Sequence, residues 1–169
     1  RMKEFEALVT RTHKAGMKVI IDFVPNHVAR QYHSIKKPKE VIDLGEGDNP
    51  DNGFDPQNNF YYCPGCSFEP MFDLRMGVNT GHPEEEVPEE EYTEFPSKAT
   101  GNDHFDNHPG QNDWYETVKL NYGIDYWTGY GHFEPVPDTW HKMTDILLFW
   151  ASKGIDGFRC DMAEMVPAA

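Results

Sequence analysis

The sequence predicts an α/β fold with parallel strands, because one order of features occurs twice. Residues 5–22 and 140–161 each contain an amphipathic helix, a glycine, a short apolar strand and a carboxylate where the strand ends. A helix that leads within a few residues into a buried strand is typical of βαβ units. Parallel strands bring their carboxyl ends to the same edge of a sheet, which predicts a functional site there.

The first segment begins with a helix. Apolar side chains recur at helical spacing between Phe5 and Ala15, with charged side chains opposite. Gly16 can end this helix in a left-handed conformation. The β-branched run at 19–21 then predicts a strand covered on both faces, and Asp22 stands at its end.

The second segment repeats the pattern. Apolar residues between Trp140 and Trp150 recur at helical spacing, Asp138 or Thr139 is the expected N-cap, and Gly154 is the expected terminator. A strand follows within two residues. Two parallel strands would leave edges and apolar faces in water, so we expect the chain to be part of a larger sheet whose remainder is its partner.

Two charged residues flank Cys160 on the second strand. Arg159 and Asp161 are two positions apart, so their side chains point to one face. An arginine keeps a neighbouring carboxylate ionised, which nucleophilic attack on an acetal carbon requires. A structural ion pair would give the same pattern. Cys160 itself is predicted to be a small core residue.

Residues 30–136 lack these periodicities and are rich in Pro, Gly, Asn, Asp and aromatic residues. A structureless loop of this length is unusual, so we expect a small irregular subdomain inserted between sheet segments 1–29 and 137–169. An acidic run at 84–91 is expected to be solvated. The aromatic group at 60–62 suits either a core or a sugar ring, and Tyr62 is taken as a candidate substrate-binding residue.

Bulk properties exclude several classes of partner. A net charge of -14 argues against nucleic acid and anionic membranes, and the absence of a long apolar run argues against a membrane-spanning helix. Cys63 and Cys66 form a CxxC without a second half-site, which favours a turn over a zinc or redox site. The cellular compartment stays open.

Three motifs resemble those of the α-amylase family of glycoside hydrolases. Residues 22–27 (Asp-Phe-Val-Pro-Asn-His) resemble its first signature, residues 157–161 (Gly-Phe-Arg-Cys-Asp) its second, and residues 117–121 (Thr-Val-Lys-Leu-Asn) a weaker third. In that family the strong motifs lie on the third and fourth strands of a TIM barrel, with domain B inserted after the third. The resemblance implies a partial (β/α)8 TIM barrel with an irregular inserted subdomain.

The resemblance also implies residue roles. Asp161 would be the nucleophile that forms a covalent glycosyl-enzyme, and Arg159 would hold it. His27 would bind the sugar, Asp22 would stabilise the site, and Asn26 would match a calcium ligand of calcium-containing members.

Two departures from the family pattern stand out. Glu164 and Met165 replace a Lys-His pair that in many amylases helps bind glucan and calcium, which weakens the calcium implication. The general acid, which retaining chemistry requires, belongs to a strand outside these residues.

We therefore expect a retaining hydrolase of α-glucosidic bonds in starch-like glucans or maltooligosaccharides, inactive as these 169 residues alone. Alternatives are a transglycosylase or branching enzyme, a non-catalytic carbohydrate-binding protein, and a metal-dependent hydrolase with Asp22, His27 and Asp161 as ligands.

Overall fold

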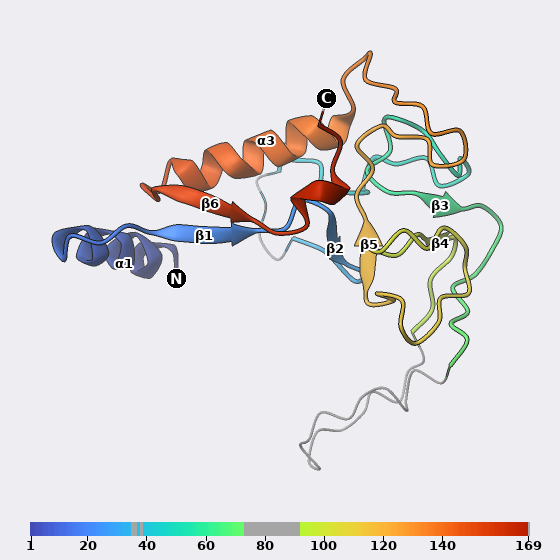
Figure 1. Ribbon diagram of the computed structural model, residues 1–169, viewed down its shortest axis with the longest axis horizontal. Helices are drawn as coiled ribbons and strands as arrows, with labels where there is room; N and C mark the ends of the chain where they lie inside the picture. The colour runs from blue at the N-terminus through green and yellow to red at the C-terminus, as the bar shows by residue number, and fades with distance from the viewer. Residues whose placement is uncertain (35–36, 38, 73–91, 169) are drawn as a thin grey trace, which may run out of the picture.

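The computed structural model describes residues 1–34, 37, 39–72 and 92–168 (Figure 1). The predicted acidic run at 84–91 lies outside these residues. The elements in chain order are α1 (Met2–Lys14), β1 (Ile20–Phe23), β2 (His27–Ala29), β3 (Tyr62–Cys63), β4 (Ser97–Lys98), β5 (Thr117–Lys119), α3 (Asp138–Ala151), β6 (Gly157–Cys160) and the 3-10 helix η1 (Ala163–Met165).

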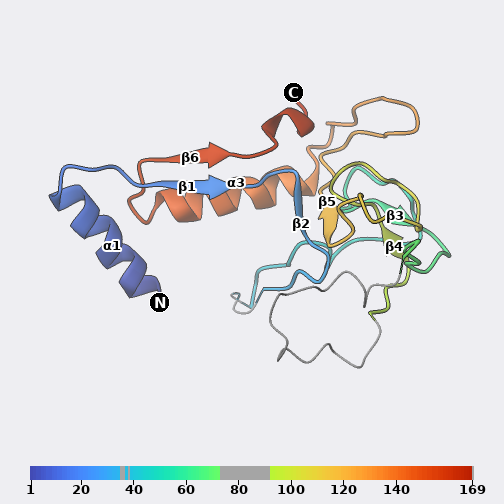
Figure 2. The same ribbon diagram turned by 60° about the horizontal axis from the view of Figure 1, so that its bottom comes forward.

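The two predicted strands pair in parallel. β1 and β6 lie side by side (Figures 1 and 2), and their register sets Asp22 opposite Arg159. The backbone N–H of Asp161 donates to the carbonyl of Phe23 at 2.9 Å, which continues the pairing past the end of β6. This confirms the predicted parallel α/β arrangement.

The glycines that follow the two helices have the predicted left-handed conformation, with φ of +73° at Gly16 and +82° at Gly154. The predicted N-cap of the second helix is wrong, since α3 has Pro137 at its N-cap. Asp138 instead accepts a hydrogen bond from the Asn59 amide, at 2.9 Å. Its side chain therefore ties α3 to the insertion and does not cap the helix.

The strand pair is more exposed than expected. Ile20 is 63% exposed and Cys160 is exposed, so the predicted coverage of both faces is wrong for these strands. The reason is topological: in the part of the chain that the structure describes, β1 and β6 have only each other as strand neighbours. α1 packs against α3 through an edge contact between Phe5 and Trp150.

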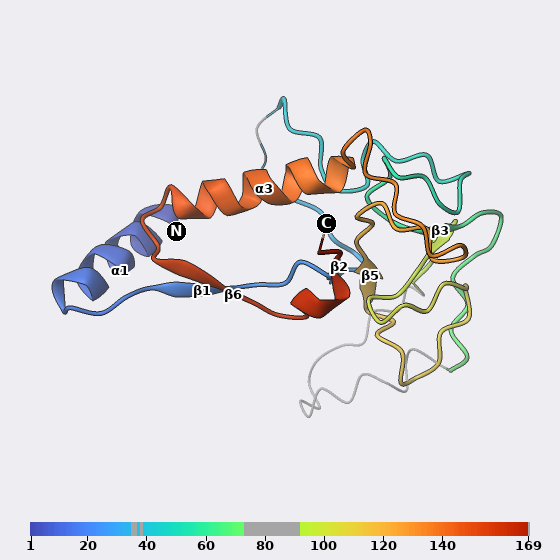
Figure 3. The same ribbon diagram turned by 45° about the horizontal axis from the view of Figure 1, so that its top comes forward.

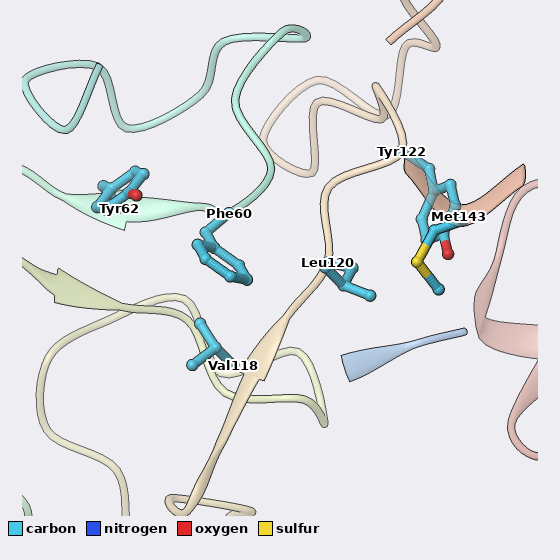
Figure 4. Packing of buried hydrophobic residues seen from close by; sticks show 6 residues of the cluster. All are labelled: Phe60, Tyr62, Val118, Leu120, Tyr122 and Met143. Atoms are coloured by element: carbon cyan, nitrogen blue, oxygen red, sulfur yellow. The ribbon is translucent and has the colours of Figure 1, made fainter. Parts of the chain in front are cut away.

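The main core lies where α3 meets the insertion. Figure 4 shows Met143 of α3 beside Tyr122, with the other side chains of the cluster extending into the insertion. Phe23, at the end of β1, packs against this cluster. The core thus fixes the carboxyl edge of the strand pair to the insertion. Its buried members are Phe60, Tyr62, Val118, Leu120, Tyr122 and Met143.

Two short antiparallel strand pairs follow: β2, at the end of the first segment, pairs with β5 of the insertion, and β3 pairs with β4 within the insertion. β2 begins at His27, so the pairing of the first segment with the insertion starts directly after Asn26. None of the helices in the described ranges is long and apolar enough to cross a membrane.

Candidate active site

Three charged side chains meet at the carboxyl edge of β1 and β6. The Arg159 guanidinium contacts Asp161 through Nη2 and Oδ1 at 2.9 Å, and Asp22 through Nη1 and Oδ1 at 3.8 Å. The parallel register produces this arrangement, because it pairs Asp22 with Arg159. The arginine is therefore shared between the two strand ends.

Solvent reaches this group. The side chains of Asp161, Arg159 and Asp22 are 39%, 60% and 72% exposed. Ion pairs of such exposure contribute about 0 to 1 kcal/mol to stability. The contact therefore serves mainly to orient Asp161, whose carboxylate stays accessible to a ligand.

The backbone turns sharply after Asp161. Met162 has a φ of +55°, and η1 follows directly. This brings the end of the described chain close to β5 (Figure 3), where the Lys119 ammonium donates to the carbonyl of Met165 at 3.3 Å. The segment after the aspartate is thus connected to the insertion.

His27 is partly buried at the start of β2, with its ring edge-on to Trp114. Burial lowers its pKa below the ordinary value, the positive charge of Lys119 lowers it further, and the negative charge of Asp161 opposes both. His27 is therefore a neutral imidazole near neutral pH, and the charge of Asp161 is close enough to influence its pKa.

The tautomer of His27 follows from its neighbour. The Asn26 oxygen accepts a hydrogen bond from Lys119, so the amide nitrogen of Asn26 faces His27 Nδ1, at 3.2 Å. An amide N–H is a donor, so Nδ1 is the acceptor and Nε2 carries the hydrogen. Nε2 is then a hydrogen-bond donor.

Gly101 lets the insertion approach this histidine closely. Its carbonyl accepts from the Asn26 amide at 2.7 Å. A Cβ at this position would lie 2.9 Å from Cβ of His27 and 2.6 Å from Oγ1 of Thr117. A larger residue would therefore push against His27.

The residues around Asn26 do not fit a calcium ion. Asn26 is fully buried, and its side-chain oxygen accepts from the Lys119 ammonium at 2.5 Å. The same ammonium contacts Asp103 Oδ1 at 2.8 Å. A divalent cation at this oxygen would face a fixed positive charge. The described residues also contain no group of three or more His, Cys, Asp or Glu side chains arranged to hold a metal. Asp22, His27 and Asp161, the ligands of the metal-dependent alternative, therefore do not form such a group among these residues.

Sequence reasoning missed Lys119 and Asp103. Lys119 lies within the third motif, and Val118, Lys119 and Leu120 are all almost fully buried. A single cation between two apolar residues of a strand was the available signal, since a buried lysine requires a partner. The sequence contained no comparable signal for Asp103.

Tyr62 does not join the site. Its side chain belongs to the core cluster, and its hydroxyl donates to Asp48 at 2.9 Å. The ring is covered by its neighbours, so its predicted role in substrate binding is not supported by its position. Cys63 and Cys66 are free thiols joined by a backbone turn, and burial raises the pKa of Cys63 to about 11.

Comparison with known proteins identifies the family. The model of the alpha amylase catalytic domain matches residues 1–169, so the chain belongs to this family. Membership implies a TIM barrel, of which a chain with two helices and one pair of parallel strands would form a part.

The chain is 27% identical to an alpha-glucosidase of Culex pipiens over 95% of its length. It is 22% and 24% identical to the amino acid transporter heavy chain SLC3A1 of Homo sapiens and of Mus musculus, each over 98% of its length. It spans about a fifth of each relative, between 19% and 21%. No solved structure matches the chain.

Proposed function

We propose that the chain forms the nucleophile side of a retaining glycoside hydrolase that acts on α-glucosidic bonds of starch-like glucans or maltooligosaccharides. The observation that carries the proposal is the accessible Asp161 carboxylate, held 2.9 Å from Arg159 at the carboxyl edge of two parallel strands. Catalytic groups of TIM-barrel enzymes lie at this edge. The family match and the alpha-glucosidase relative support the same reaction class.

In this proposal Asp161 attacks the anomeric carbon, and the bond to the leaving oxygen breaks as a covalent glycosyl-enzyme forms. Arg159 keeps the attacking carboxylate oriented, and Asp22 holds the arginine from the neighbouring strand. His27 donates from Nε2 to a hydroxyl of the same sugar. The leaving oxygen takes its proton from a general acid outside these 169 residues, so these residues alone are expected to be inactive.

The test is Asp161→Asn in the full-length protein, assayed with an aryl α-glucoside and with maltooligosaccharides. Loss of the nucleophile is expected to lower kcat at least about 1000-fold. Asp156→Asn is the matched control, because Asp156 lies just before β6, at the opposite end of the strand. NMR of the first product is expected to show retained α configuration.

A covalent label strengthens this test. A fluorinated glycosyl fluoride should accumulate as an ester of Asp161, which peptide mass spectrometry would locate. An Asp161→Asn enzyme with wild-type turnover, or a label on another residue, would contradict the assignment. Chromatography of the products separates hydrolysis from transfer to a second sugar.

The second candidate is a non-catalytic family member. Two of the relatives are amino acid transporter heavy chains, which favours this possibility. A full-length protein that shows no turnover on any α-glucoside, while Asp161 and Arg159 are intact, would favour this second function.

A further inference from the structure

We propose that the ammonium group of Lys119 is the permanent cation of the junction between the strand edge and the insertion, so that the protein needs no calcium there. This goes beyond the proposed function, because it concerns how the site is assembled and not which bond is cleaved.

Three oxygens from three parts of the chain surround this ammonium. The side-chain oxygen of Asn26, after β1, is at 2.5 Å; the carboxylate of Asp103, after β4, is at 2.8 Å; and the carbonyl of Met165, in η1, is at 3.3 Å. An amide oxygen, a carboxylate and a backbone carbonyl are the kinds of ligand that calcium takes. Here a lysine on β5 occupies the centre of that set.

The ammonium is built into the fold. Its side chain is 2% exposed, while that of Asp103 is 35% exposed. Burial lowers the pKa of Lys119, whereas the contact with Asp103 raises it. Asp103 adopts a φ of +68°, a conformation that aspartate tolerates better than most residues. From this backbone conformation the Asp103 carboxylate contacts the Lys119 ammonium.

The position of the lysine has a functional consequence. Met165 lies four residues after Asp161, and Asn26 lies next to His27. One ammonium thus links the segment that follows the nucleophile to the residue that precedes the histidine at the start of β2. Because this cation is covalently part of β5, a chelator cannot remove it.

The experiment measures the thermal unfolding midpoint of the full-length protein in excess calcium chloride and in excess EDTA. The wild-type midpoint is expected to be the same in both, and equilibrium dialysis with calcium should show no stoichiometric binding at this junction. A wild-type midpoint that rises in calcium and falls in EDTA would overturn the proposal.

Two variants test the site itself. Lys119→Asp supplies a carboxylate among the three oxygens, so its midpoint should become higher in calcium than in EDTA. Lys119→Met should lower the midpoint in both solutions. Lys98→Met is the control, because Lys98 is a partly exposed lysine paired with Glu94 elsewhere in the insertion. A Lys119→Asp protein without a calcium response, or a Lys119→Met midpoint equal to that of the control, counts against the proposal.

If Lys119→Asp fails to fold, the wild-type comparison in calcium and EDTA still decides the question. The proposal about Lys119 is tested by unfolding and by calcium binding, whereas the proposed hydrolase activity is tested by turnover. Failure of one proposal is therefore distinguishable from failure of the other.

Discussion

Gly101→Ala tests whether the insertion positions His27 by close approach. The added methyl carbon would lie 2.9 Å from Cβ and 3.0 Å from Cγ of His27, and 2.6 Å from Oγ1 of Thr117. Favourable contacts between carbon atoms lie near 3.5–4.0 Å, so each neighbour must retreat by roughly half an ångström or more. The hydroxyl of Thr117 is held by the carbonyl of Trp114 at 2.7 Å and cannot move freely. His27 is the side chain expected to shift.

The expected cost has two parts. Overpacking of this kind costs about 1 to 3 kcal/mol. The hydrogen bond that the Gly101 N–H donates to Oγ1 of Thr117, now 2.9 Å, adds about 1 kcal/mol if it breaks. Alanine has a smaller conformational entropy than glycine in the unfolded chain, which offsets about 0.4 to 1 kcal/mol of this cost. The net loss in the free energy of unfolding is therefore about 1 to 3 kcal/mol.

Denaturant unfolding and steady-state kinetics of the full-length protein measure both effects. kcat/KM on an aryl α-glucoside should fall by more than the stability loss explains, because the histidine moves relative to Asp161. Gly47→Ala is the matched control, since its methyl carbon would make only an ordinary 3.7 Å contact with Ile42. Equal stability and equal kcat/KM in the two variants would refute the close-approach argument.

Two further predictions follow from burial and charge. Arg30→Met removes the buried partner that lies 2.6 Å from Glu94, and it should lower the free energy of unfolding by about 3 to 5 kcal/mol. Lys153→Met is the control, because the ion pair of Lys153 with Glu6 is more exposed and its loss should cost about 1 kcal/mol or less. Asp161→Asn removes the charge that favours protonated His27, so NMR titration should show the histidine pKa falling further below 6.5. An unchanged His27 pKa in this variant would show that the charge of Asp161 does not act on His27, which would contradict the arrangement described above.

The lowered pKa of His27 also predicts how the free energy of unfolding depends on pH. The folded pKa of His27 is below its unfolded value of 6.5. The neutral side chain therefore contributes stability that is fully present above pH 6.5 and is lost as the pH falls through the folded pKa. Asp161→Asn should move that loss to lower pH.

The parts of the fold that local chemistry decides were predictable from sequence. Gly16 and Gly154 have no side chain to oppose a left-handed turn, so they mark the helix ends without reference to the rest of the chain. The parallel pairing of the two apolar strands was also predicted, from the repeated order of helix, glycine and strand, whereas the register that sets Asp22 opposite Arg159 was not. Local pattern was sufficient for the helix ends because each glycine lies next to the feature it predicts.

The parts that depend on distant partners were not predictable. Asp138 has the sequence features of an N-cap, yet it pairs with Asn59, which lies far away in the chain. Tyr62 has the character of a sugar-binding ring, yet it packs in the core and its hydroxyl donates a hydrogen bond to Asp48. In both cases a hydrogen bond to a residue remote in sequence decided the outcome, and no spacing rule contains that information.

Two cations of the candidate site and its surroundings illustrate the same distinction. Arg159 is 60% exposed, and its pairing with Asp161 follows from strand alternation, so it could be inferred from two residues. Lys119 is 2% exposed, and its partners come from three separate parts of the chain. Water screens the first ion pair more than the second. Arg159 can therefore orient a carboxylate with little effect on stability, whereas the buried Lys119 adds polar contacts to the apolar core that already connects the insertion to the strand edge. Strand-end motifs thus predict which charged groups of the candidate site meet at an accessible strand edge, and contacts between residues far apart in sequence determine how the neighbouring segments are held.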